Sequence, residues 1–454
     1  MLDISLSKDT FYRRFGEIGY LFNQSLQKET VLDSIGSLFV SQIERFPRNL
    51  QLVSEEIAKC FHNVEISLIE NDLLDLIQHL GINCYFDING ELPFIGSKNE
   101  DSKNKMKSDT NLILKRYFQK NPVPLYAHLE ITSACNLQCI HCYWPHHRVH
   151  HMPKNEILFI LDELRKLGCV HLTLSGGEPL LHPDILDIIE YARLSDLSVT
   201  LMTNGTNISM DIATWLKSLD LASIQITLYS MRETVHDTIT GIKNSFSKTR
   251  RGIETLLEGN NHVKIANPVM KQNLDSFIEV DKHYRPLGVF VDHDLEIVAR
   301  SDFSFDNTFC RLSKEELKSA ARLIRKYENS FNTDQYAITN DTNHIREPED
   351  PVCGAGIQML SISVDGTAYP CPNFSLSMGN VLHQGLSELF ENSIELDSLR
   401  SLTNSKYPKC MSCPTLEFCS LCPANFFSES GGDYLTPCDY FCQVAKAFST
   451  AAHT

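Results

Sequence analysis

The sequence lacks the usual features of membrane proteins and of nucleic-acid-binding proteins. None of its apolar runs reaches the roughly 20 residues that span a bilayer. The opening residues 1–9 lack a basic stretch followed by an apolar core, so no export signal is indicated and we expect a cytoplasmic protein. Lys and Arg number 41 against 57 Asp and Glu, a net charge of -16. This deficit of positive charge argues against a general binder of nucleic acid, because phosphate backbones select for Lys and Arg.

The composition is that of an ordinary globular chain, except for its many cysteines. Of the 454 residues, 42% are hydrophobic and 22% are charged, and the length predicts about three domains. Fifteen cysteines without an export signal are better explained by metal binding than by disulfides. Eleven of them fall into two groups, three at positions 135–142 and eight at 353–442. The other four are isolated, and we expect buried apolar thiols at Cys60, Cys84, Cys169 and Cys310.

The first group of cysteines lies on one short loop. Cys135, Cys139 and Cys142 follow an apolar stretch, residues 125–132, that has the pattern of a strand. Three thiolates can hold three irons of a cubane cluster and leave the fourth iron without a protein ligand. A zinc site would more often show paired cysteines, and a disulfide framework would need an oxidising compartment. The spacing therefore favours an iron-sulfur cluster with one open iron.

Residues 123 to about 300 alternate strand-like and helix-like periods with short connections. This alternation predicts repeated βα units on a parallel sheet, and six units would make an open, partial barrel of the (β/α)6 type rather than a closed eight-stranded one. In such sheets the working groups lie at the carboxyl ends of the strands, where the cysteine loop falls. Strands are expected at 125–132, 170–175, 198–203, 223–228, 262–269 and 289–298, with helices at 155–167, 184–194, 211–219, 246–258 and 274–284.

The cysteine loop and the segment Thr173-Leu-Ser-Gly-Gly-Glu-Pro179 resemble the radical S-adenosylmethionine superfamily. The resemblance implies a [4Fe-4S] cluster on Cys135, Cys139 and Cys142, with S-adenosylmethionine as cosubstrate. An Arg that binds the cosubstrate carboxylate in many relatives has no counterpart in residues 236–241. The implied cosubstrate contacts are His141 near the adenine, Gly176 and Gly177 in a close backbone approach, Glu178 at the ammonium group, Thr203 and Asn204 in the ribose-side turn, and Thr227 on the fourth strand.

The cysteine-rich tail resembles the SPASM domain, which carries auxiliary iron-sulfur clusters. It contains Cys353, then Gly366 and Cys371, and then the run Cys410-x2-Cys413-x5-Cys419-x2-Cys422. The last spacing departs from the usual three intervening residues, and a zinc ribbon is the alternative for this run alone. By family pattern Cys353, Cys371 and Cys422 would hold the nearer auxiliary [4Fe-4S] cluster, and Cys410, Cys413 and Cys419 the farther one. Cys438 and Cys442 would complete one cluster each, in an order that stays open, for three clusters in all.

The first 95 residues have a different pattern. Short strands are expected at 18–23 and 37–43, and helices at 52–61 and 67–80, the second ended by Gly81. Strands followed by helices suggest a winged-helix-like unit, similar to the precursor-recognition element of enzymes that modify ribosomally made peptides; a cap that only packs on the barrel is the alternative. The expected domains are 1–95 for peptide recognition, a Lys-rich linker at 96–122, the barrel at 123–330 and the SPASM domain at 331–454. Ser313 and Glu316 form a capping box that would open a helix to about residue 326.

Together these resemblances imply a peptide maturase. A 5'-deoxyadenosyl radical would abstract hydrogen from a ribosomally made precursor peptide, a thioether or carbon-carbon cross-link would form, and the auxiliary clusters would accept the remaining electron. A flavodoxin- or ferredoxin-type protein would reduce the first cluster. The alternatives are a sulfatase-maturing enzyme, a peptide epimerase with Cys310 as a weak candidate for hydrogen donor, and a non-enzymatic iron-sulfur regulator or electron carrier.

Overall fold

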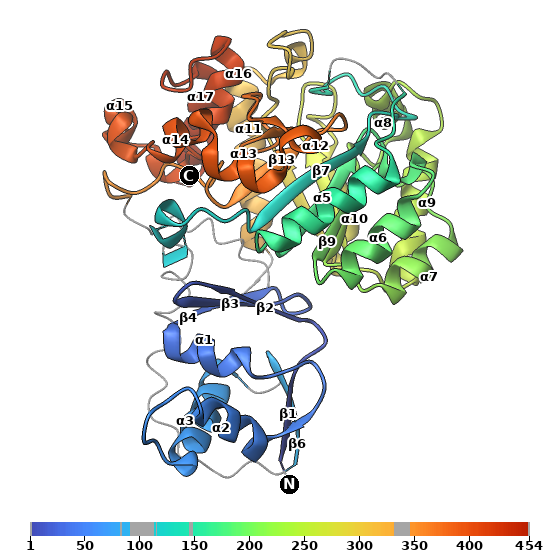
Figure 1. Cartoon of the computed structure of the whole chain (residues 1–454). Helices are drawn as coiled ribbons and strands as arrows, with labels where there is room; N and C mark the ends of the chain where they lie inside the picture. Colours follow the sequence, from blue (N-terminus) through green and yellow to red (C-terminus); the bar gives the residue numbers. More distant parts are fainter. Residues whose placement is uncertain are drawn as a thin grey trace. The chain divides into compact units, whose positions relative to one another are not determined.

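The chain divides into two compact units, Met1–Tyr117 and Phe118–Thr454. The computed structural model describes residues 2–81, 84–90, 113–114, 116–144, 149–330 and 346–452. Figure 1 shows the first unit in blue and the second from cyan to red. Within these ranges, no helix is both long enough and apolar enough to cross a membrane.

Among its described residues up to position 90, the first unit combines two small antiparallel sheets with three helices. One sheet has the order β2-β3-β4 and the other the order β5-β1-β6. Their strands are β1 (Asp3–Leu6), β2 (Thr10–Phe15), β3 (Ile18–Asn23), β4 (Lys28–Leu32), β5 (Arg48–Asn49) and β6 (Phe86–Asn89), and the helices are α1 (Ser34–Ser41), α2 (Leu50–Ala58) and α3 (Ile66–Leu80). The strand expected at 18–23 and the helices expected at 52–61 and 67–80 are confirmed, the helices with shifted ends.

The strand expected at 37–43 is wrong, because most of this segment lies in helix α1. The Asp33 side chain accepts a hydrogen bond from the backbone N–H of Gly36 at 2.8 Å, which is an N-cap contact. Gly36, Phe39 and Val40 are buried in the spacing of three and four residues that one helical face requires. The capping signal at Asp33 was readable in the sequence, but the short apolar run was taken for a strand.

The predicted linker at 96–122 falls largely outside the described residues, which exclude 91–112. Residues 116–120 are helical. Within the first unit, the Tyr117 hydroxyl donates a hydrogen bond to the carbonyl oxygen of Phe15 at 2.7 Å. The chain is therefore attached to the β2 end of the first unit just before the second unit begins.

The second unit contains six parallel strands in sequential order. All six strands predicted for the barrel are confirmed, with ends that differ by a few residues. The ladder runs β12-β11-β10-β9-β8-β7. Its members are β7 (Tyr126–Thr132), β8 (His171–Gly176), β9 (Ser198–Thr203), β10 (Ser223–Thr227), β11 (Val263–Pro268) and β12 (Phe290–Asp294).

Helices cover one face of this sheet (Figure 1). Side chains from the helices and from alternate strand positions, such as Leu172, Ile188, Leu201 and Ile253, form one buried cluster. Helix α8 was not expected, since its residues 233–240 are rich in Thr and poor in strong helix formers. The helices are α5 (Lys154–Lys166), α6 (Ile185–Leu194), α7 (Met210–Ser218), α8 (Glu233–Thr240), α9 (Ser245–Glu258) and α10 (Phe277–Tyr284).

The tail continues the same sheet. Strand β13 (Met359–Ile362) pairs in parallel with β7, and β14 (Thr367–Tyr369) and β15 (Gly379–Asn380) follow it in antiparallel order. The capping box is confirmed, since the backbone N–H of Ser313 donates to Glu316 Oε2 at 2.7 Å where α11 begins. The remaining helices are α11 (Lys314–Ser330), α12 (Val381–Gln384), α13 (Leu386–Asn392), α14 (Ile394–Arg400), α15 (Pro408–Met411), α16 (Pro423–Ser430) and α17 (Asp439–Ala452).

Candidate active site

The three-cysteine loop leaves the carboxyl end of β7 and is held by the end of helix α8. The backbone N–H of Gln138 donates to Thr240 O at 2.8 Å, and that of Ile140 donates to Ile239 O at 3.0 Å. Within the loop, the N–H of Cys142 donates to Cys139 O at 3.0 Å. The helix that the sequence did not predict therefore sets the path of the cluster loop.

The three thiols of this loop suit a cluster that lacks one protein ligand. All are free and partly exposed. Burial, together with the nearby Cys142 and Cys135, raises the pKa of Cys139 to about 12, although the hydrogen bond from Tyr229 lowers it, so the three thiols are close neighbours. Metal binding displaces thiol protons, so the irons of a cluster would stabilise these three thiolates in the deprotonated form.

Gly176 and Gly177 permit a close approach between the end of β8 and the cluster loop. A Cβ atom on Gly176, where φ is +129°, would lie 2.1 Å from Thr132 O, and one on Gly177 would lie 2.3 Å from Ala134 O. The N–H of Gly177 donates to Thr132 O at 2.7 Å. These contacts give both glycines a role in joining two strand ends, beside the ligand approach that the resemblance implies.

Glu178 lies fully buried beside the end of β9. Its Oε1 accepts from the Thr203 hydroxyl at 2.6 Å, and its Oε2 accepts from the Asn204 N–H at 2.6 Å. Burial raises the pKa of Glu178, while these donors and the Leu180 N–H lower it. The structure therefore brings the predicted residues Glu178, Thr203 and Asn204 together, with the carboxylate binding protein donors.

Asn204 connects the turn after β9 to the cluster loop. Its Nδ2 donates to Asn136 Oδ1 at 2.7 Å, and Asn136 Nδ2 donates to the Thr206 hydroxyl at 2.8 Å. The Thr249 hydroxyl of helix α9 donates to Asn204 O at 2.9 Å. Asn136 and Thr206 were not singled out in the sequence, although Asn136 lies within the cysteine motif itself.

His141 contacts Tyr229, which follows β10. Its Nε2 lies 2.8 Å from the Tyr229 hydroxyl, and the two rings meet edge to face at 5.3 Å between centroids. Burial lowers the pKa of His141 to about 4, so the ring is neutral at physiological pH. The role predicted for His141 at the adenine is untested, and Tyr229 was overlooked within the segment read for Thr227.

Thr227 lies on the sheet face that is not covered by helices. Its neighbours in the strand, Ile226 and Leu228, belong to the helix-side core, whereas Thr227 is half-buried. Across the sheet Thr227 pairs with Ala266, which pairs with Asp292. Lys264 lies on this face as well. Burial raises the pKa of Asp292, and the charges of His293 and Lys264 offset part of this rise. This face is therefore polar and suited to a charged ligand.

The tail cysteines form two sets of neighbours. One set is Cys353, Cys371 and Cys422, since Cys353 and Cys422 each raise the pKa of the Cys371 thiol after the larger effect of burial. In the other set, Cys419, Cys442 and Cys413 act in the same way on Cys410, whose pKa rises to about 11, mainly through burial. In the parts of the chain that the structure describes, no three His, Cys or acidic side chains are grouped tightly enough to ligate a single metal ion.

The isolated cysteines follow the prediction at three of four positions. Cys84, Cys169 and Cys310 are buried, as expected. The prediction for Cys60 is wrong because this residue is exposed. Cys60 follows the end of α2, where the turn leaves the helix face that packs on the core.

The chain matches two protein families. Residues 129–283 match the radical SAM superfamily, and residues 353–414 match SPASM, an iron-sulfur cluster-binding domain. AdoMet-dependent heme synthase of Methanosarcina barkeri is 28% identical over 67% of this chain and 93% of its own length. The subtilosin biosynthesis protein AlbA of Bacillus subtilis is 25% identical over 66% of this chain and 67% of its own. Mycofactocin maturase MftC of Mycobacterium tuberculosis is 26% identical over 69% of this chain and 82% of its own length.

Solved structures share this fold at low sequence identity. Streptococcus suis SuiB bound to its precursor peptide SuiA has a TM-score of 0.61 at 16% identity and covers 94% of this chain and 97% of its own. The anSMEcpe structure with bound AdoMet and a peptide has a TM-score of 0.59 at 19% identity and covers 72% of this chain and 96% of its own. The chain contains a radical SAM domain, and a SPASM iron-sulfur cluster-binding domain follows it.

Proposed function

We propose that this enzyme installs an oxidative cross-link, a thioether or a carbon-carbon bond, in a ribosomally synthesised precursor peptide. The observation that carries the proposal is the extent of the structural likeness. The peptide-bound SuiB structure covers 94% of the chain, which must include most of the first unit, whereas the anSMEcpe structure covers 72%. AlbA and MftC, the relatives named for bacteriocin biosynthesis and mycofactocin maturation, support the same class of substrate.

Cys135, Cys139 and Cys142 would hold the first cluster and leave one iron for the cosubstrate. When bound, that cluster and S-adenosylmethionine supply the 5'-deoxyadenosyl radical that abstracts hydrogen from the peptide. The chain positions this chemistry through Gly176, Gly177, Glu178, Thr203 and Asn204, which join the ends of β8 and β9 to the cluster loop. His141 and Thr227 complete the proposed cosubstrate contacts.

The tail would hold two auxiliary [4Fe-4S] clusters, for three in all. The four thiolates of a cubane bind four different irons, so they stand farther apart than the ligands of one zinc ion. The two sets of neighbouring tail thiols offer ligands for two such clusters, which supports clusters over a single zinc ribbon. Cys442 joins Cys410, Cys413 and Cys419 in this proposal, since Cys419 and Cys413 are its thiol neighbours. Cys438 is then left to complete the set of Cys353, Cys371 and Cys422.

The first unit would act as a winged-helix-like domain that captures the leader segment of the precursor. Strands β2 and β4 are the outer strands of their sheet, and an extended peptide can pair with such an edge. We assign recognition to residues 1–95, a linker to 96–122, the radical SAM partial barrel to 123–330 and the SPASM domain to 331–454. The proposed partners are the precursor peptide and a cytoplasmic flavodoxin- or ferredoxin-type electron donor.

The competing functions leave part of the chain without a role. A sulfatase-maturing enzyme would not need a leader-binding unit. A peptide epimerase needs a hydrogen donor, and Cys310 is fully buried. A non-enzymatic regulator would make no use of the open three-cysteine loop beside the Gly-Gly-Glu-Pro turn.

The test uses the reconstituted enzyme and candidate precursor peptides from short reading frames beside its gene. We expect reductant and S-adenosylmethionine to give 5'-deoxyadenosine together with a peptide that has lost a pair of hydrogen atoms, located as a cross-link by tandem mass spectrometry. A peptide of unchanged mass with altered stereochemistry would show an epimerase. A Cys or Ser converted to formylglycine would show a sulfatase-maturing activity.

A further inference from the structure

A buried ion pair joins the cysteine-rich tail to the segment that follows β12. Arg311 lies just before α11, and Glu429 lies in the last turn of α16. Nη1 of Arg311 donates to Glu429 Oε2 at 2.9 Å, and Nη2 donates to Oε1. The two side chains are 14% and 8% exposed. A bidentate pair of this kind fixes the direction of the carboxylate as well as its charge.

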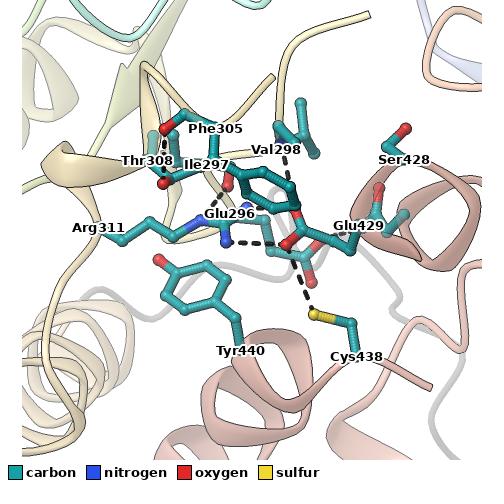
Figure 2. A network of polar contacts seen from close by, with 12 residues as sticks. Glu296, Ile297, Val298, Phe305, Thr308, Arg311, Ser428, Glu429, Cys438 and Tyr440 are labelled. Atoms are coloured by element: carbon teal, nitrogen blue, oxygen red, sulfur yellow. Dashed lines mark hydrogen bonds and ion pairs between the residues drawn. The ribbon is translucent and has the colours of Figure 1, made fainter. Parts of the chain in front are cut away.

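The pair is fixed by further contacts on both sides (Figure 2). Nε of Arg311 donates to Ile297 O at 2.8 Å, and the Ala299 N–H donates to Glu429 Oε1 at 3.2 Å. The Arg311 guanidinium lies 4.4 Å from the centroid of the Tyr440 ring. Neither side chain can therefore rotate away without losing several interactions at once.

The fixed carboxylate is the polar partner of a tail cysteine. Cys438 Sγ donates to Glu429 Oε2 at 3.7 Å, and Figure 2 shows the thiol directed at this oxygen just before α17 begins. Arg311 binds the same carboxylate oxygen that faces the sulfur, so a negative and a positive charge both lie close to Cys438. Cys438 is the one tail cysteine that we have paired with a carboxylate rather than with other thiols.

We propose that Glu429 and Arg311 are positioning residues: the carboxylate orients the Cys438 thiol until it gives up its proton and ligates the nearer auxiliary cluster, and the two charges then set the reduction potential of that cluster. This inference rests on the proposed function for the presence of the cluster. Cluster potentials depend on net charge and on hydrogen bonds to the ligand sulfurs. A carboxylate beside the sulfur opposes the entry of an electron and lowers the potential, and the guanidinium offsets part of this effect.

The same segment also contacts the first cluster loop. Nδ2 of Asn307 donates to His141 O at 3.0 Å and to Val298 O at 2.9 Å, and the Ser301 N–H donates to Tyr143 O at 3.0 Å. Residues 297–311 thus bind the first cluster loop at one side and the Glu429 carboxylate at the other. One short stretch of chain therefore connects the first cluster loop to the carboxylate that faces Cys438.

The test is an EPR-monitored redox titration of the reconstituted full-length enzyme without peptide. Glu429→Gln should keep its iron and raise the potential of one auxiliary cluster, while Arg311→Gln should lower that potential. Shifts of opposite sign would not come from a merely structural role. Glu429→Asp, which keeps the charge, should return the potential toward that of the unmodified enzyme. Asp281→Asn is the matched control, since Asp281 forms a buried pair with Arg285 at 2.7 Å on α10, and its potentials should be unchanged.

Two results would overturn the positioning role. One is an unmoved auxiliary potential in both Glu429→Gln and Arg311→Gln when the unmodified enzyme shows the auxiliary signals. The other is a Cys438→Ala variant with full iron content and unchanged potentials, since Cys438 would then be no ligand. The absence of any auxiliary signal in the unmodified enzyme would instead reject the cluster content of the proposed function. The two failures are thus distinguishable.

Discussion

The hydroxyl of Tyr229 lies 3.4 Å from the Sγ atom of Cys139, within hydrogen-bonding distance for sulfur. Tyr229 is held firmly, because it is 3% exposed and its carbonyl oxygen accepts from Asn273 Nδ2 at 2.8 Å. The hydroxyl also contacts His141 Nε2, so it joins two side chains of the cluster loop. A residue beyond the cysteine motif therefore contacts a proposed cluster ligand directly.

Tyr229→Phe should lower the reduction potential of the first cluster. The substitution removes a hydrogen-bond donor from the Cys139 sulfur, and such donors stabilise the reduced, more negative cluster. Loss of the buried hydrogen bonds should also decrease the free energy of unfolding by about 1 kcal/mol. A redox titration followed by EPR measures the first effect. An unchanged potential would show that the hydroxyl does not reach the sulfur in the loaded enzyme.

Replacing Cys135, Cys139 and Cys142 together by Ala should abolish reductive cleavage of S-adenosylmethionine. These thiols are the proposed ligands of the first cluster, and no cluster forms without them. Chromatography of 5'-deoxyadenosine measures the loss. Cys60→Ala is the matched control, because Cys60 is exposed and isolated, and its cleavage rate should equal that of the unmodified enzyme. Undiminished cleavage in the triple variant would contradict the assignment of the loop.

The reconstituted enzyme should contain about twelve irons per chain, four in each of three clusters. The triple Ala variant at the first loop should keep about two-thirds of them. Measuring the iron and zinc contents of the same samples distinguishes two auxiliary clusters from a zinc site in the tail. Stoichiometric zinc with about four irons would identify the tail as a zinc ribbon instead.

Gly177→Ala should displace the cluster loop and deplete the iron of the first cluster. The new Cβ would lie 2.3 Å from the carbonyl oxygen of Ala134, so one strand end has to move. We expect a loss of about 1–3 kcal/mol in the free energy of unfolding, as in overpacked sites. Gly288→Ala is the control, because φ is +78° there but no atom lies within 4 Å of the new Cβ. The control should lose about 1 kcal/mol from backbone strain and keep all of its iron. Equal iron contents in the two variants would refute the role given to Gly177.

Removing residues 1–117 should weaken binding of the full-length precursor by at least about tenfold, or roughly 1.4 kcal/mol. The cut follows the boundary between the two compact units. Uncoupled cleavage of S-adenosylmethionine should persist, because the proposed cosubstrate contacts all belong to the second unit, and this cleavage also reports that the barrel is folded. Fluorescence polarisation with a labelled precursor measures the affinity. Equal affinity with and without the segment would reject peptide capture and favour the alternative, a cap that only packs on the barrel.

Features that depend on neighbouring residues were predictable from the sequence. The spacing of Cys135, Cys139 and Cys142, the alternation of the six βα units, the end of α3 at Gly81 and the capping box at Ser313 are all local patterns. Backbone geometry converts such patterns directly into a loop, a strand or a helix end. The error at residues 37–43 was local too, since a short apolar run fits either period until its N-cap is recognised.

Only the tertiary structure decided which distant residues meet. The sequence alone left Cys438 and Cys442 unassigned and gave Glu178 a cosubstrate rather than Thr203 and Asn204 as partners. It contained no signal that β13 would pair with β7 or that Arg311 would bind Glu429, 118 positions away. These contacts arise when the parallel sheet brings the ends of several strands to one edge and the tail packs against them. The free energy of apolar burial and strand pairing over the whole second unit selects these contacts. No short stretch of sequence encodes them.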